Sequence, residues 1–163
     1  MRKHVVIMGV SSCGKSTVGE LLAQRTGLPF RDGDDMHPAA NIEKMASGQA
    51  LDDDDRKPWL ESIGRFLAEQ ESGAIVGCSA LKHSYRDIIR AAAPDTVFIH
   101  LHGSYELLKE RMSRRTGHFM PVSLLDSQFE TLEELRPEEA GILLDVSATP
   151  EELAAAAAEY LER

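Results

Sequence analysis

The chain has 163 residues, of which 42% are apolar, and a formal charge of −9. This length can bury a continuous hydrophobic core, and we expect one domain over residues 1–163. The acidic balance argues against a nucleic-acid-binding surface, which needs clustered cations. No stretch approaches the roughly 18 uninterrupted apolar residues of a membrane span. Because the N-terminus also lacks the pattern of a secretory signal, we expect a cytoplasmic protein that binds neither nucleic acid nor membrane.

Short apolar runs alternate with helical stretches along the whole chain. The first helix, over residues 16–25, has apolar residues at helical spacing and ends before Gly27. The last helix begins at Pro150, has two glutamates in its first turn and ends near residue 161. This alternation is typical of a parallel sheet covered by helices. The five expected strands are residues 5–8, 28–31, 74–78, 97–101 and 142–146.

Two segments interrupt the alternation, residues 32–58 and residues 111–135. Long insertions between strands commonly carry binding residues and mobile flaps. We therefore predict an α/β three-layer sandwich with a five-stranded parallel sheet, in which residues 32–58 form a helical substrate-binding segment and residues 111–135 form a lid.

A glycine-rich turn separates the first expected strand from the first expected helix. Its pattern, G-x-x-x-x-G-K-[ST], is filled by Gly9, Gly14, Lys15 and Ser16. Glycines let successive backbone N–H groups point at one phosphate, and the helix N-terminus adds unpaired donors. Lys15 can reach the outer phosphates, and the Ser16 hydroxyl is a natural ligand for Mg²⁺ bridging nucleotide phosphates. The other loop residues expected to contact the nucleotide are Ser11, Ser12, Cys13 and Thr17.

Two carboxylates follow the second expected strand. Asp32 and Asp34 stand on alternate residues, so their side chains point to the same side, next to the phosphate-binding turn. We expect Asp32 to help hold Mg²⁺ and Asp34 to orient or deprotonate an attacking hydroxyl. Asp35 is expected only to cap the following turn.

Four stretches together carry a family resemblance: "GVSSCGKST", "DGDDMHPAANIEKMASGQALDDDDRKPWL", "CSALKHSYRD" and "TGHFMPVSLLDSQFETLE". The chain resembles the gluconate kinases, which are P-loop kinases of the shikimate-kinase-like group. The resemblance implies Mg²⁺-dependent transfer of the γ-phosphoryl group of ATP to the 6-hydroxyl of D-gluconate, giving 6-phosphogluconate and ADP in sugar-acid catabolism. It also implies a homodimer.

Gluconate is a carboxylate lined with hydroxyls, so its pocket needs a fork-shaped cation and several hydrogen-bonding groups. The candidate substrate residues, besides Asp34, are His37, Arg56, Lys82, Arg86 and Gln128. For Arg56 the resemblance implies a cation that holds the acid. Solvated surface remains the alternative for the three cations, and a bond to a turn carbonyl remains the alternative for His37.

Other residues in this part of the chain are expected to have structural roles. The acidic run of residues 52–55 is expected to cap a helix, with Pro58 in its first turn. Trp59 and Met45 are expected in the core, because a helix over the sheet must bury large side chains.

The stretch "ERMSRRTGHFMP" places Arg111, Arg114 and Arg115 at the end of a helix. A phosphotransferase must neutralise charge on the transferred group and exclude water. We expect Arg115 to supply that cation, with Arg114 as the alternative, and both would otherwise complement the helix dipole. Kinases that resemble this chain sandwich the adenine, which implies that Arg111 stacks on it opposite Pro150.

Two other functions stay open at this point. One is a kinase for another small hydroxy-acid, such as shikimate. The other is a regulatory module that binds ATP without a second substrate, although such a module has little need of a carboxylate base beside the γ-phosphate.

Overall fold

In the computed structural model, which describes residues 1–114 and 122–163, five parallel strands form one sheet in the order β2-β3-β1-β4-β5. The expected parallel sheet is confirmed. Strand β2 begins at Phe30 rather than at residue 28, because Gly27 ends the preceding helix at φ 80° and Pro29 has no N–H for the ladder. The strands are β1 (His4–Met8), β2 (Phe30–Asp32), β3 (Ala74–Gly77), β4 (Val97–His102) and β5 (Gly141–Asp145).

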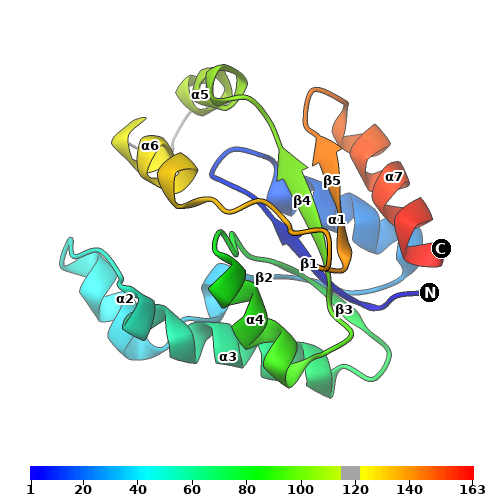
Figure 1. Ribbon diagram of the computed structural model, residues 1–163, viewed down its shortest axis with the longest axis horizontal. Helices are drawn as coiled ribbons and strands as arrows, with labels where there is room; N and C mark the ends of the chain where they lie inside the picture. The colour runs from blue at the N-terminus through cyan, green and yellow to red at the C-terminus, as the bar shows by residue number, and fades with distance from the viewer. Residues whose placement is uncertain (115–121) are drawn as a thin grey trace.

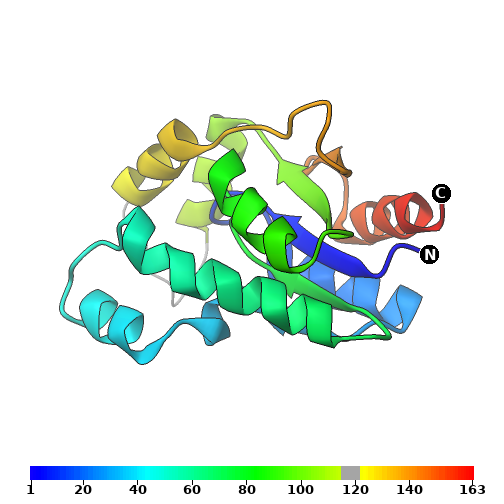
Figure 2. The same cartoon turned by 60° about the horizontal axis from the view of Figure 1, so that its bottom comes forward.

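Helices cover both faces of this sheet (Figures 1 and 2). Helices α1 and α7 pack together over one face, and α3 and α4 pack together over the other, which confirms the three-layer sandwich. None of the described helices, the longest of which has 17 residues, is both long and apolar enough to cross a bilayer. The helices are α1 (Lys15–Thr26), the 3-10 turn η1 (Gly33–Met36), α2 (Ala39–Ala46), α3 (Asp53–Glu69), α4 (His83–Ala92), α5 (Tyr105–Ser113), α6 (Val122–Thr131) and α7 (Pro150–Glu162).

The alternation of side chains along β1 produces the two cores. Val5 and Ile7 pack into the cluster that contains Leu22 of α1. Val6 and Met8 pack into the cluster that contains Ile63 of α3. Because both faces are buried, a central parallel strand reads as a continuous apolar run. The core therefore fixes the carboxyl end of β1, where the glycine-rich turn begins.

Helix α3 begins earlier than the sequence suggested. Asp52 caps it by accepting a hydrogen bond from the N–H of Asp55 at 2.8 Å, and the Asp55 carboxylate accepts from the N–H of Asp52 at 2.9 Å. Capping by the acidic run is thus confirmed, but the expectation that Pro58 lies in the first turn was wrong. The acids supply the cap and the whole first turn, so the proline falls in the second turn, where only the exposed Asp54 carbonyl lacks its helical donor.

Arg86 of α4 is fully buried. Its Nε donates to Glu139 Oε1 at 2.8 Å, and its two terminal nitrogens donate to Glu139 Oε2 at 3.0 Å and to the Ala80 carbonyl at 2.9 Å. Burial alone would raise the pKa of Glu139, but hydrogen bonds from Arg86, from the N–H of Arg136 and from Arg90 lower that pKa to about 2. The substrate contact expected of Arg86 was wrong, because its guanidinium is committed to this internal ion pair.

We expect Glu139→Gln to destabilise the folded protein by about 3 kcal/mol at pH 7, because it leaves the buried Arg86 charge uncompensated. Urea unfolding measures this, with the exposed neighbour Glu138→Gln as the control. The folded-state pKa lies below the ordinary value of 4.5, so the stabilisation is complete above that pH and is lost as pH falls toward about 2. The difference between wild type and Glu139→Gln should shrink over that range. Equal stabilities at pH 7 would contradict the assigned pair.

Candidate functional site

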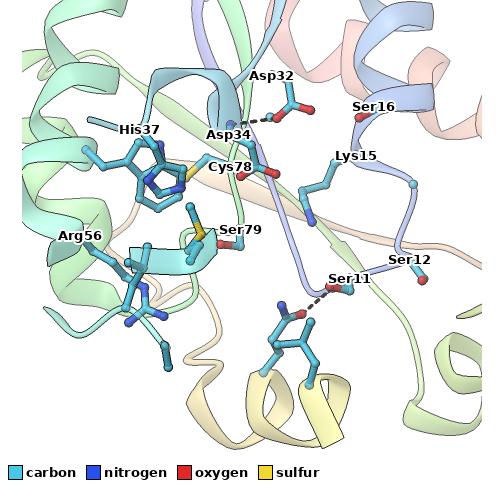
Figure 3. Close-up of a pocket in the computed structure, with 18 of the residues that line it drawn as sticks. Ser11, Ser12, Lys15, Ser16, Asp32, Asp34, His37, Arg56, Cys78 and Ser79 are labelled. Atoms are coloured by element: carbon cyan, nitrogen blue, oxygen red, sulfur yellow. Dashed lines mark hydrogen bonds between the residues drawn. The ribbon is translucent and has the colours of Figure 1, made fainter. Parts of the chain in front are cut away.

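A cleft of about 820 Å³ opens at the carboxyl ends of β1, β2 and β3. This edge is where parallel α/β sheets bind ligands. Figure 3 shows side chains from the turn after β1, from the segment after β2 and from α3 pointing into the same space. The predicted site residues that line the cleft are Ser11, Ser12, Gly14, Lys15, Ser16, Thr17, Asp32, Asp34, His37, Arg56, Arg111 and Gln128.

Other predicted site residues lie elsewhere. Cys13 was expected to contact the nucleotide, but it is buried beneath the glycine-rich turn with 2% of its surface exposed and does not line the cleft. Pro150 is the first residue of α7, after the capping residue Thr149, and does not line the cleft. Arg115 lies outside the described residues. Arg114 pairs with Glu110 one turn earlier on α5.

The turn between β1 and α1 is shaped as an anion-binding loop. Gly9 and Gly14 have φ of 149° and 95°, in the region that favours glycine. A Cβ on Gly9 would also lie 2.7 Å from the Leu101 carbonyl oxygen, so no side chain fits there. No side chain caps the start of α1. Among the described residues, Ser12 Oγ is buried with no hydrogen-bond partner. Free helix N–H groups and an unpaired hydroxyl suit phosphate oxygens.

Lys15 lies over this loop. Its Nζ donates to the carbonyl of Gly9 at 2.9 Å and lies 3.3 Å from the carbonyl of Val10. These carbonyls hold the ammonium at the rim of the loop, facing the cleft (Figure 3). A bound phosphate would therefore meet a positive charge already in place.

Gln128 of α6 contacts the same loop. Its Oε1 accepts a hydrogen bond from the backbone N–H of Ser11 at 2.6 Å, drawn as the dashed line at Ser11 in Figure 3. An oxygen atom thus sits on one of the amides that face a phosphate in loops of this kind. The sequence suggested Gln128 as a substrate residue, whereas the structure places it against the phosphate-binding loop.

Asp34 reaches the cleft although β3 separates β2 from β1 in the sheet. Desolvation by the surrounding walls and the nearby Asp32 charge raise the pKa of Asp34, and Lys15 opposes the shift. Asp32 Oδ1 accepts a hydrogen bond from the N–H of Asp34 at 2.9 Å and so caps η1. The capping role expected of Asp35 was therefore wrong, because Asp32 fills it.

Asp32 and Ser16 place two oxygen groups at the cleft, beside the phosphate-binding loop (Figure 3). Mg²⁺ prefers oxygen ligands, and in nucleotide sites it takes one or two from the protein and the rest from phosphates and water. The residues present therefore fit such an ion together with a nucleotide.

The wall opposite the phosphate-binding loop includes two stacked rings. His37 stacks on Trp59 with ring centroids 4.2 Å apart and planes at 16°. Trp59 Nε1 donates to the Gly33 carbonyl at 2.7 Å, and the residue is 4% exposed, so its expected burial is confirmed. Met45 is 43% exposed and lines the cleft, so its expected core position was wrong. It belongs to neither core cluster, because α2 lies away from the sheet.

Asp53 forms ion pairs with two cations, Arg56 and Lys82. It accepts from Tyr85 Oη at 2.5 Å and pairs with Lys82 Nζ at 3.1 Å, and an Arg56 terminal nitrogen lies 3.4 Å from Tyr85 Oη. Lys82 does not line the cleft, which differs from the substrate contact expected of it. Sequence reasoning missed Asp53 and Tyr85 as supports of Arg56. The signal available was that Lys82 and Tyr85 stand three residues apart at the start of one helix.

An anion-binding loop that faces a carboxylate across one cleft of a parallel sheet is the arrangement of P-loop kinases that phosphorylate small molecules. Comparison with known proteins narrows this class. A profile of the family described as shikimate kinase matches residues 11–161. The chain belongs to this family, and within it to the gluconokinases.

The relatives that carry this assignment cover most of the chain. The thermosensitive gluconokinase of Escherichia coli K12 is 48% identical over 142 residues, which are 85% of this chain and 75% of that protein. The thermoresistant gluconokinase of the same strain is 41% identical over 97% of this chain and 93% of that protein. A solved gluconokinase from Sinorhizobium meliloti 1021 is 50% identical, with a TM-score of 0.90 over 99% of this chain and 93% of that one.

Proposed function

We propose that this protein transfers the γ-phosphoryl group of ATP to the 6-hydroxyl of D-gluconate, releasing 6-phosphogluconate and ADP. The observation that carries the proposal is that Lys15 and Asp34 face the same cleft. The similarity to gluconokinases supports gluconate as the acceptor, rather than the shikimate considered from sequence.

The phosphate-binding loop and Lys15 would hold the triphosphate, and Ser16 and Asp32 would hold Mg²⁺. When bound, Mg²⁺ supplies positive charge to the phosphate oxygens. Asp34 accepts a hydrogen bond from the 6-hydroxyl, orients it toward the γ-phosphorus and takes its proton as the new bond forms. Arg111 donates to the Val146 carbonyl at 2.6 Å, which supports its placement beside the adenine after β5.

Arg56 would hold the gluconate carboxylate. Arg56 lines the cleft, and contacts with Asp53 and Tyr85 hold its side chain in place. A guanidinium offers two parallel N–H groups to a carboxylate, which a lysine cannot reproduce. His37 lines the same cleft as Arg56 and Asp34 and would contact the hydroxyls. Arg115 remains our prediction for the cation beside the transferring group.

We expect Arg56→Lys to raise the KM for gluconate about 10-fold, because one of two charge-assisted hydrogen bonds is lost. The KM for ATP should change less than about 2-fold, because Arg56 does not contact the phosphate-binding loop. Steady-state kinetics with each substrate varied in turn measure both. The matched control is Arg65→Lys on the exposed side of the same helix, which should leave both constants unchanged. An unchanged KM for gluconate would move the carboxylate site away from Arg56.

A coupled assay of ADP release, run with gluconate, with shikimate and with no acceptor, tests the proposed function. ADP should appear rapidly only with gluconate. Faster release with shikimate would identify a different acid as the substrate. Equal release without any acceptor would contradict a kinase and support a nucleotide-binding module. The homodimer and the cytoplasmic location remain predictions, and sedimentation velocity would test the first.

A further inference from the structure

Asn41 is a buried polar residue on the first turn of α2, with 4% of its surface exposed. Its amide nitrogen, Nδ2, donates to the backbone carbonyl of Asp55 at 2.9 Å. A carbonyl oxygen only accepts, so the nitrogen of the Asn41 amide, and not its oxygen, must face Asp55. The orientation of this amide is therefore set by the backbone of α3.

The same nitrogen lies 3.2 Å from Nδ1 of His37. An amide nitrogen can only donate, so Nδ1 of His37 is the acceptor. A neutral imidazole that accepts at Nδ1 carries its proton on Nε2. Burial lowers the pKa of His37; the nearby Asp34 charge opposes this shift and Arg56 adds to it. The hydrogen bond at Nδ1 and the lowered pKa both favour a neutral ring with its one N–H at Nε2.

The plane of the ring is fixed independently. His37 stacks on Trp59, and Trp59 is anchored through its own N–H to the Gly33 carbonyl. Stacking sets the plane, and the Asn41 bond sets the rotation within that plane. Since His37 lines the cleft, the position of its remaining donor is also set before any ligand arrives.

We propose that Asn41 is a positioning residue that holds His37 as the Nε2–H tautomer, so that His37 donates a hydrogen bond to a hydroxyl oxygen of the acceptor. This rests on the proposed function, in which the acceptor is a polyhydroxy acid. Asp34 then accepts a hydrogen bond from the hydroxyl that reacts, and His37 donates a hydrogen bond to a neighbouring hydroxyl. The pair selects an acceptor that has two hydroxyls at adjacent positions.

The tautomer can be measured without any substrate. In the folded protein with ¹⁵N-labelled histidine, long-range ¹H–¹⁵N spectra at pH 7.5 should show a pyridine-type Nδ1 and a pyrrole-type Nε2 for His37. The variant His37→Gln identifies which signals belong to this residue. In Asn41→Asp the carboxylate can accept but not donate, so the His37 proton should move to Nδ1 or the ring should become charged. A pyrrole-type Nδ1 in the wild-type protein would overturn the proposal.

The kinetic test uses Asn41→Ala, which removes the donor without adding charge. We expect the KM for gluconate to rise about 3- to 10-fold and the KM for ATP to stay within about 2-fold. A cooperative thermal unfolding transition checks that the variant is folded. His37→Gln keeps an N–H donor, so its KM for gluconate should rise less than that of His37→Ala. Equal losses in those two variants, or an unchanged KM for gluconate in Asn41→Ala, would overturn the positioning role.

The two kinds of failure are distinguishable. A wild-type protein that does not phosphorylate gluconate overturns the proposed function, and with it the role of His37 toward gluconate. The tautomer of His37 is decided by the spectra alone. A pyridine-type Nδ1 that persists in Asn41→Asp would show that Asn41 does not set the tautomer, whatever the substrate is.

Discussion

Asp34→Asn should lower kcat with gluconate by about 10²-fold or more, because asparagine keeps the shape of the side chain but cannot accept the proton of the attacking hydroxyl. The side chain lies in the cleft that Lys15 also faces. The walls of the cleft and Asp32 raise the pKa of Asp34, so the carboxylate binds a proton more readily than a carboxylate in water does. The loss should fall on kcat more than on either KM, since the proton moves in the transition state.

Rapid-quench measurement of the first turnover separates this chemical step from product release. Asp35→Asn is the matched control, because Asp35 is the next residue and carries the same group, but it does not line the cleft. It should retain near-normal turnover. If Asp34→Asn turns over at the wild-type rate, the base lies elsewhere.

Lys15→Ala should also reduce turnover by about 10²-fold or more. Its ammonium is held over the glycine-rich turn by the carbonyls of Gly9 and Val10. There it can stabilise negative charge that builds up on the outer phosphates during transfer, which the free amides of the loop alone cannot fully offset. The variant should stay folded, because Lys15 is only half-buried and its side chain belongs to neither core cluster.

The kcat and the KM for ATP of Lys15→Ala are measured beside those of Lys57→Ala, which removes an exposed lysine that does not line the cleft. Circular dichroism and thermal unfolding check that both variants fold. A Lys15→Ala enzyme whose kcat and KM for ATP match those of Lys57→Ala would show that the ammonium contributes nothing to binding or transfer.

The phosphate-binding loop and the alternation of strands and helices along the chain could be predicted, because their signals are local. The backbone conformation of the loop requires glycine at positions 9 and 14. Strand β1 can be identified because it has apolar residues on both faces. Asp32 and Asp34 also both line the cleft, as expected, but the expected reason was wrong, because Asp34 lies in the 3-10 turn η1 and not on an extended chain.

The contacts of the cations could not be predicted, because their partners lie far along the chain. Arg86 appeared able to bind substrate until the structure placed it inside the protein against Glu139. Lys82 pairs with Asp53, whose place in the acidic run before Pro58 had indicated only helix capping. No motif in the sequence indicates a role for Asn41. Its proposed role depends on the hydrogen bonds that its side chain makes to His37 and to the backbone of α3.

The most direct test of the central claim is a crystal structure with gluconate and a non-hydrolysable ATP analogue. The account predicts that the triphosphate lies on the glycine-rich loop with Lys15 at its outer phosphate. It also predicts that the 6-hydroxyl of gluconate lies within hydrogen-bond distance of the Asp34 carboxylate and in line with the γ-phosphorus. A complex in which Asp34 contacts neither gluconate nor the space beside the γ-phosphate would contradict it.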